Sequence, residues 1–140
     1  MNKKEIEAVI PHRDPFLFVD ECEVSVPGKI GRGKRLVTGK EDFFQGHFPG
    51  NPVMPGVLLV ETMAQVLAVT LLSHPDYKGK TVYFGGIEKA KFRKKVKPGD
   101  LLDMKVEITR LLGPAGKGNG TAYVDGEVAC TVTATFFMGE

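Results

Sequence analysis

Residues 46–65 read GHFPGNPVMPGVLLVETMAQ, and this stretch organises the rest of the chain. Three prolines and three glycines within residues 46–56 restrict the backbone path, because proline fixes φ and glycine permits conformations closed to other residues. This path carries His47 and leads into the most apolar segment of the sequence, residues 57–72, which contains Glu61. A histidine on a stiff loop and a carboxylate in an apolar helix suggest an acid–base pair.

Residues 57–72 are apolar on nearly all sides, which is typical of a helix surrounded by protein. The segment is shorter than the roughly 20 residues that a bilayer requires, so we expect a buried helix and no membrane span. Its polar residues Glu61 and Gln65 are four positions apart and therefore share one helix face.

The flanking sequence predicts mostly strands. Asn2 is expected to cap a short helix over residues 3–9. Strands are expected at residues 16–26, 29–38, 81–87, 101–112 and within 121–138, with loops at 39–45 and 113–120. Because strands do not alternate with helices, we predict one α+β domain over residues 1–140, a sheet around one buried helix, rather than a doubly wound parallel sheet.

Composition narrows the range of functions. With 42% apolar and 26% charged residues, the chain has the composition of a soluble globular protein. Its net charge of +2 is too small to give the positive electrostatic field that favours nucleic-acid binding. The N-terminus lacks the pattern of a signal peptide. Cys22 and Cys130 are far apart and form no metal-binding spacing, so we expect reduced thiols in a cytoplasmic protein.

The sequence contains no convincing phosphate-binding loop, serine nucleophile or metal site. Residues 28–34 have the spacing of a phosphate-binding loop, but Arg35 stands where the metal-binding serine or threonine belongs, and no helix pattern follows. Neither serine lies in a nucleophile-elbow pattern. The three histidines are too widely separated to form a local metal site. We therefore expect no nucleotide, metal or other cofactor.

His47, Glu61 and Gly56 remain as candidates for chemistry. The simplest alternative for His47 is a loop histidine hydrogen-bonded to the backbone. Glu61 should find a hydrogen-bond donor or hold a proton, because an unpaired charge in an apolar helix is costly. Gly56, at the start of the helix, has a free N–H that a carbonyl oxygen can approach. Together the three residues predict proton transfer beside a carbonyl group.

These residues also carry a resemblance to a known family. Residues 46–58, followed by Glu61 and Gln65, resemble the signature of the 3-hydroxyacyl-[acyl carrier protein] dehydratases of type II fatty acid synthesis. Matches to other motifs of that family occur at residues 11–13, 15–17, 19–20, 91–93 and 98–100. The resemblance covers most of the chain and implies the hot-dog fold, an antiparallel sheet wrapped around one long central helix.

The implied reaction removes water from a (3R)-3-hydroxyacyl thioester to give the trans-2-enoyl thioester, without a cofactor. By this resemblance, His47 would abstract the proton at C2 and Glu61 would help to protonate the departing hydroxyl. The Gly56 N–H would hold the thioester oxygen. Supporting contacts to the substrate are expected from Phe48, Pro55 and Gln65.

The resemblance also implies an assembly. Members of the family form dimers, often three dimers to a hexamer, with His47 of one subunit meeting Glu61 of its neighbour. Glu61 stands where the branch that also isomerises the double bond has aspartate, which favours the non-isomerising branch. Asp14 replaces a frequent aromatic residue, and the loop at 113–120 looks long, so the acyl chain-length preference stays open. His12 is expected to be structural within its turn.

A basic stretch follows at residues 89–97, which hold six cations. It is either a solvated strand edge that resists aggregation or a docking surface for the acidic acyl carrier protein that presents the substrate in this family. For docking, the expected contacts are Lys89, Lys91 and Arg93, which alternate along the chain.

Two other functions remain as alternatives. In a hot-dog thioesterase, Glu61 would activate water against the same thioester, whereas a non-catalytic module would only bind acyl groups. The sequence from His47 to Gly50 favours dehydration over the thioesterase, whereas loss of turnover in a dimeric His47→Ala variant would argue against the non-catalytic module.

Overall fold

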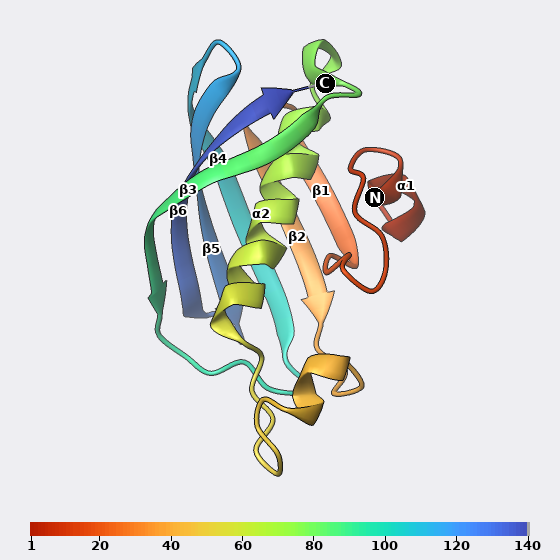
Figure 1. Ribbon diagram of the computed structural model, residues 1–140, viewed down its shortest axis with the longest axis vertical. Helices are drawn as coiled ribbons and strands as arrows, with labels where there is room; N and C mark the ends of the chain where they lie inside the picture. Colours follow the sequence, from red (N-terminus) through yellow and green to blue (C-terminus); the bar gives the residue numbers. More distant parts are fainter. Residues whose placement is uncertain (140) are drawn as a thin grey trace.

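The computed structural model describes residues 1–139. In chain order its elements are α1 (Lys3–Glu7), β1 (Glu21–Val26), β2 (Ile30–Leu36), the 3₁₀ helix η1 (Asp42–Gln45), α2 (Gly56–Leu72), the 3₁₀ helix η2 (Pro75–Tyr77), β3 (Thr81–Phe92), β4 (Leu101–Leu112), β5 (Ala115–Val124) and β6 (Glu127–Gly139). The strands form one six-stranded antiparallel sheet in the order β1-β2-β4-β5-β6-β3. The sheet curves around α2 (Figure 1), which confirms the predicted α+β arrangement.

Helix α2 is the core of the molecule. Every residue from Thr62 to Leu72 is buried, as expected for a helix with protein on most sides. The proline-rich loop that precedes it extends beyond the sheet (Figure 1), so α2 joins the packed core to the segment that carries His47. Within residues 1–139, no helix combines the length and apolar character of a membrane span.

Glycines on the inner face of the sheet allow α2 to lie close to it. A Cβ atom on Gly31 would lie 1.9 Å from Thr70 Oγ1, and one on Gly33 would lie 2.5 Å from Val66 Cγ2. Both glycines belong to β2 and to the stretch whose spacing mimics a phosphate-binding loop. Their spacing of two therefore reflects close packing of a helix on a strand.

The prediction of a loop at residues 113–120 is wrong. β4 and β5 are joined directly at Gly113 and Pro114, and β5 already begins at Ala115. The glycines that suggested a loop alternate along β5, and a Cβ on Gly118 would lie 2.8 Å from Leu67 Cδ2. Gly118 and Gly120 are thus positions in a strand that face α2, Gly116 faces Phe136 of β6, and the expected long loop does not exist.

The strand predicted at residues 16–26 begins only at Glu21. The preceding segment is buried, but side chains take the place of a neighbouring strand. Gln65 Oε1 accepts from the Phe18 N–H at 2.8 Å, and Gln65 Nε2 donates to the Phe16 carbonyl at 2.8 Å. Arg35 Nη1 donates to the Phe18 carbonyl at 3.1 Å. The apolar pattern indicated burial correctly, but the hydrogen-bond partners lie far away in sequence.

Other boundaries differ by smaller amounts. The first helix ends at Glu7, with the predicted Asn2 cap present. The 39–45 segment contains η1. The strand predicted at residues 81–87 continues to Phe92 because it pairs with β6 along its whole length.

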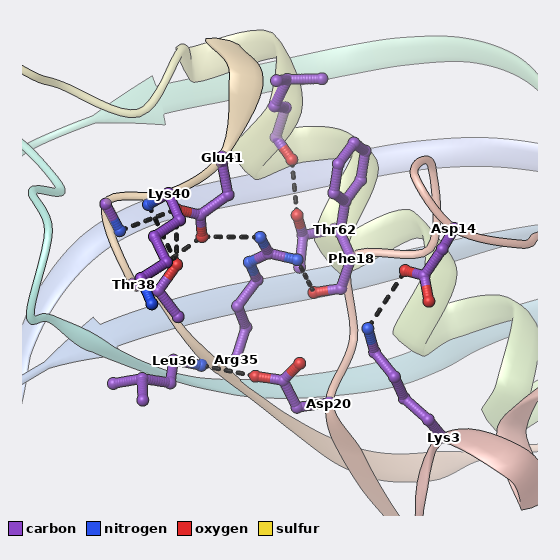
Figure 2. Close-up of polar contacts among 12 residues, drawn as sticks. Lys3, Asp14, Phe18, Asp20, Arg35, Leu36, Thr38, Lys40, Glu41 and Thr62 are labelled. Carbon is purple, nitrogen blue, oxygen red and sulfur yellow. Dashed lines mark hydrogen bonds and ion pairs between the residues drawn. The ribbon is translucent and has the colours of Figure 1, made fainter. Parts of the chain in front are cut away.

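A largely buried ion pair between Arg35 and Glu41 holds the segment that joins β2 to η1 and leads to His47. Arg35 Nη2 lies 2.8 Å from Glu41 Oε2 (Figure 2), and the Glu41 carboxylate also accepts from the Thr38 and Gly39 N–H groups at 3.2 and 2.8 Å. Burial raises the pKa of Glu41, but these hydrogen bonds outweigh burial and lower it to about 2. The carboxylate thereby holds the start of η1 against β2.

Candidate active site

His47 lies in the loop before α2 and is held by main-chain contacts at both ends. Its Nδ1 is 2.7 Å from the Val53 carbonyl, and its own carbonyl accepts from the Val53 N–H at 3.0 Å. A carbonyl oxygen can only accept, so Nδ1 carries the hydrogen of the neutral ring and Nε2 keeps a free lone pair. The backbone bond that we considered as the simplest alternative thus leaves Nε2 available as a base.

Phe48 and the backbone on either side limit the movement of the His47 ring. The Phe48 ring stacks on the imidazole, with centroids 4.0 Å apart and planes 27° apart. The His47 N–H donates to the Phe43 carbonyl at 3.1 Å, which ties the loop to η1. The position of the His47 ring is therefore fixed by contacts within the chain.

Gly56 begins α2, and Pro55 occupies the cap position before it. Within residues 1–139 the Gly56 N–H has no hydrogen-bond acceptor, as expected for the first residue of a helix. A Cβ at this position would lie 2.8 Å from Phe92 Cε1, so the ring packs where only glycine fits. The free N–H and the helix dipole together suit an oxygen with developing negative charge.

His47 and Gly56 line the same cavity. It has a volume of about 380 Å³, and its other lining residues are Val53, Met54, Leu59, Phe92, Arg93, Lys94, Lys95 and Val96. The structure therefore brings together two of the three groups that the sequence suggested, a base and an N–H donor.

Glu61 lies elsewhere in the same chain. It borders a cavity of about 140 Å³ whose other lining residues are all apolar: Val57, Val60, Ala64, Leu67, Phe84, Ile87, Val132 and Ala134. The two cavities share no lining residue. A single chain thus does not place the His47 ring and the Glu61 carboxylate in one cavity.

Glu61 finds the donor that an apolar surrounding requires. Gln65 Nε2 donates to Glu61 Oε2 at 2.9 Å, across the helix face that the spacing of four predicted. Gln65 is fully buried and is also bonded to the segment before β1. Gln65 thus contacts the Glu61 carboxylate directly, and its full burial leaves no side-chain surface for the substrate contact that the sequence suggested.

His12 is a residue that the sequence analysis missed. Its Nε2 lies 3.6 Å from Glu61 Oε2, and its side chain is only 27% exposed. The signal was present, because His12 belongs to a family-like motif, but no local pattern links it to a residue so distant in sequence. We treated it as a turn residue, whereas the fold places it beside the carboxylate.

The basic stretch divides into two parts. Lys89 and Lys91 are exposed on β3, opposite Thr133 and Thr131 of β6, so they share one face of the strand. Arg93 lies just beyond β3 and lines the His47 cavity together with Lys94 and Lys95. The cations therefore extend from the sheet edge to the mouth of this cavity.

Comparison with known proteins identifies the family. The model of the FabA-like domain matches residues 10–133. The 3-hydroxyacyl-[acyl-carrier-protein] dehydratase FabZ of Ligilactobacillus salivarius is 54% identical over 96% of this chain and 96% of its own. That of Clostridium novyi is 55% identical over 98% of this chain and 96% of its own.

Solved structures with low identity share the fold. The dehydratase heterocomplex ApeI:P from Xenorhabdus doucetiae superposes with a TM-score of 0.68 at 20% identity, over 84% of this chain and 94% of the other. A hypothetical thioesterase from Streptococcus pneumoniae, solved with coenzyme A, gives 0.66 at 14% identity, over 97% and 95%. These likenesses confirm the hot-dog fold, which dehydratases and thioesterases share. Since the family model and the close relatives cover nearly all of it, the chain belongs to the 3-hydroxyacyl-[acyl-carrier-protein] dehydratases of the FabA-like family.

Proposed function

We propose that this chain removes water from (3R)-3-hydroxyacyl groups carried on acyl carrier protein, giving trans-2-enoyl groups for fatty acid biosynthesis. The relatives that carry this activity in their names match over nearly the full chain. The observation that supports the chemistry most directly is the shared cavity of the His47 ring, with Nε2 free, and the unpaired Gly56 N–H.

In the proposed mechanism, His47 Nε2 takes the proton from C2 of the substrate. The electrons of that C–H bond move toward the thioester carbonyl, whose oxygen gains negative charge and is held by the Gly56 N–H. As the C2–C3 double bond forms, the C3 hydroxyl leaves with a proton from Glu61, as water. His47 and Glu61 end the step protonated and deprotonated respectively, and return to their starting states by exchange with solvent.

We further propose that the complete site forms between two copies of the chain. Within residues 1–139, β3 is an edge strand, paired only with β6. Its exposed surface includes Tyr83, Ile87 and Phe92, which are 46%, 56% and 53% exposed, and Val57 on the adjacent helix is 75% exposed. A long edge strand with exposed apolar side chains favours pairing with a second chain.

A dimer formed along β3 would bring a second copy against both cavities, because Phe92 lines that of His47 and Ile87 lines that of Glu61. His47 of one subunit would then meet Glu61 of the other. Three such dimers in a hexamer are the larger assembly that the family resemblance allows.

The substrate would arrive on the acidic carrier protein, and we propose that Lys89, Lys91 and Arg93 form its docking surface. Within residues 1–139 these three side chains make no ion pair, whereas nearby Lys94 lies 3.7 Å from Glu127 Oε2. Free cations beside the mouth of the His47 cavity are suited to guiding an acidic partner.

A cytoplasmic location is part of the proposal. Cys22 and Cys130 are both free and buried, as is usual for thiols in a reducing compartment. Burial raises the pKa of each thiol to about 11, so neither is suited to act as a nucleophile.

The test of the function is a product assay with carrier-linked 3-hydroxyacyl substrate. We expect mass spectrometry to show loss of one water from the acyl group while the thioester stays intact. His47→Ala should lower kcat by about 10²–10⁴-fold, the usual effect of removing a positioned base. The circular dichroism spectrum of the variant, and the number of subunits that native mass spectrometry detects, should not change.

Release of the free carrier thiol without an enoyl product would instead identify a thioesterase. Binding of the acyl carrier without turnover by the unmodified protein would support a non-catalytic module. Undiminished turnover by His47→Ala would rule out His47 as the base.

A further inference from the structure

We propose that His12 is a positioning residue for Glu61 that, together with Gln65, determines which carboxyl oxygen carries the acid proton. The inference rests on the proposed role of Glu61 as the acid that protonates the departing hydroxyl.

The orientation of the Gln65 amide is determined by its partners. Oε1 accepts from the Phe18 N–H at 2.8 Å, so the opposite atom is the NH₂ group. Its two hydrogens point to the Phe16 carbonyl at 2.8 Å and to Glu61 Oε2 at 2.9 Å. Because Gln65 is fully buried and all three contacts are satisfied, the amide cannot turn without losing them. Glu61 Oε2 is therefore an acceptor.

The His12 ring presents a second donor to the same oxygen. Its Nδ1 is buried and has no hydrogen-bond partner within residues 1–139. Nδ1 therefore has no partner in either tautomer, whereas Nε2 faces an oxygen that accepts, so the tautomer that suits this arrangement carries its hydrogen on Nε2. Nε2 faces Glu61 Oε2 at 3.6 Å, longer than a hydrogen bond, and catalytic contacts of this kind often shorten when substrate binds.

The turn that carries His12 is itself held in place. Arg13 Nη1 donates to the Ile10 carbonyl at 2.9 Å and to the His12 carbonyl at 2.8 Å. The Arg13 guanidinium thus bonds the main chain on both sides of Pro11, and the His12 imidazole extends from a turn stabilised by these hydrogen bonds. Apart from Glu61, the side chains that line the carboxylate cavity are all apolar, so they offer no competing charge.

Gln65 donates to Oε2 and His12 faces the same oxygen, which leaves Oε1 for the reaction. In a protonated carboxyl group one oxygen carries the hydrogen while the other accepts, so the acid proton of Glu61 lies on Oε1. No hydrogen bond from residues 1–139 reaches that atom. When Oε1 gives up its proton, the new negative charge is stabilised by both donors, which strengthens their bonds in the transition state. His12 should therefore affect kcat and leave KM unchanged.

The test compares three substitutions of His12 in the full-length enzyme. His12→Ala should lower kcat by about tenfold, the effect of losing one hydrogen bond to a charged group, with KM unchanged. His12→Gln should restore most of kcat, because its amide nitrogen reaches the position of Nε2. His12→Asn should not, because its shorter amide corresponds to Nδ1. His74→Ala, a histidine near the other end of α2, is the control and should leave kcat unchanged.

A double-mutant cycle then asks whether His12 acts through Glu61. Glu61→Gln should reduce kcat by about 10²–10⁴-fold, and adding His12→Ala should cost nothing further, because the group on which His12 acts is gone.

The contrary results distinguish the role of His12 from the role of Glu61. Fully additive losses, an effect confined to KM, or equal activity of His12→Gln and His12→Asn would overturn the role of His12. A Glu61→Gln variant with undiminished kcat would overturn the proposed acid itself, whatever the His12 variants do. Thermal melting of the Gln and Asn variants shows whether they are equally well folded.

Discussion

At the residue scale, the proposed mechanism depends on which atom of the His47 and Glu61 side chains is already engaged in a hydrogen bond. The Val53 carbonyl engages Nδ1 of His47 and leaves Nε2 free. Gln65 engages Oε2 of Glu61 and leaves Oε1 free. In both residues a hydrogen bond within the chain engages one atom and leaves the other without a partner among the described residues. This preorganisation lowers the cost of aligning reacting groups after the substrate binds.

A single carboxylate also makes stability depend on pH. The pKa of Glu41 is lowered in the folded protein from 4.5 to about 2. A lowered folded pKa means that the stabilisation is complete above the unfolded value and is lost as the pH falls toward the folded value. Glu41 therefore contributes to stability at neutral pH and progressively less below pH 4.5.

We expect Glu41→Gln to have a lower free energy of unfolding than the unmodified protein at pH 7. The difference should shrink as the pH falls from 4.5 to about 2, because over that range the carboxylate takes up a proton in the unfolded chain while it stays largely ionised in the folded protein. Urea denaturation across this range measures it. A difference that stays constant down to the lowest pH would show that the charge of Glu41 is not the source of the stabilisation.

At the scale of elements, the contact between α2 and β2 depends on the absence of side chains. Gly31 faces Thr70, whose Oγ1 also donates to the Val66 carbonyl at 2.8 Å. The helix and the strand are too close for a methyl group between them. Interiors at native density accept such insertions only with local displacement.

We expect Gly31→Ala to destabilise the protein by about 1–3 kcal/mol through overpacking. In the double variant Gly31→Ala/Thr70→Ala the nearest atom, Thr70 Oγ1, is removed, so part of the loss should be recovered. Gly46→Ala is the control, because a Cβ there meets nothing within 4 Å. Calorimetry measures all three variants, and an unchanged melting temperature for Gly31→Ala would contradict the packing argument.

The docking function proposed for the basic stretch can be tested separately. Replacing Lys89, Lys91 and Arg93 by glutamine should raise KM for the carrier-linked substrate by about tenfold at low salt, because electrostatic guidance is lost. KM for a short pantetheine thioester, which has no carrier protein, should not change. The dependence of KM on salt should also become weaker.

The matched control replaces Lys29, Lys34 and Lys105, three exposed lysines at or near the part of the sheet formed by β2 and β4. It removes the same number of charges and should leave KM for both substrates unchanged. An equal effect from both triple variants would mean that net charge, rather than a docking surface, governs carrier binding.

At the scale of the whole molecule, the separation of His47 and Glu61 into different cavities has a direct consequence. If each site takes one residue from each subunit, a mixed dimer of His47→Ala and Glu61→Gln chains holds one complete site. Each variant alone has none.

We therefore expect activity to reappear when the two inactive variants are denatured together and refolded. At equal amounts the yield should be about a quarter of the unmodified rate, because half of the dimers are mixed and each has one intact site. Native mass spectrometry of tagged chains confirms that mixed dimers are present. Mixed dimers without activity would place the complete site within one chain.

Much of the architecture follows from the sequence alone because it depends on short-range patterns. The apolar run after residue 56 identified the buried helix, and the alternation at residues 101–112 matched β4 at both ends. The loop from His47 to Gly56 identified the candidate base and N–H donor, since prolines, glycines and a helix start are local features. The same motif indicated the family, which the comparisons confirmed.

The tertiary structure alone decided what depends on partners distant in sequence. It turned most of the glycine-rich 113–120 segment into β5, because Gly118 and Gly120 face a helix that a local pattern cannot reveal. It replaced the start of the strand predicted at residue 16 with contacts to Gln65. It also brought His12 beside Glu61. The physical reason is the same in each case: backbone preference and periodicity act over a few residues, whereas close packing and hydrogen bonding join whichever residues the fold brings together.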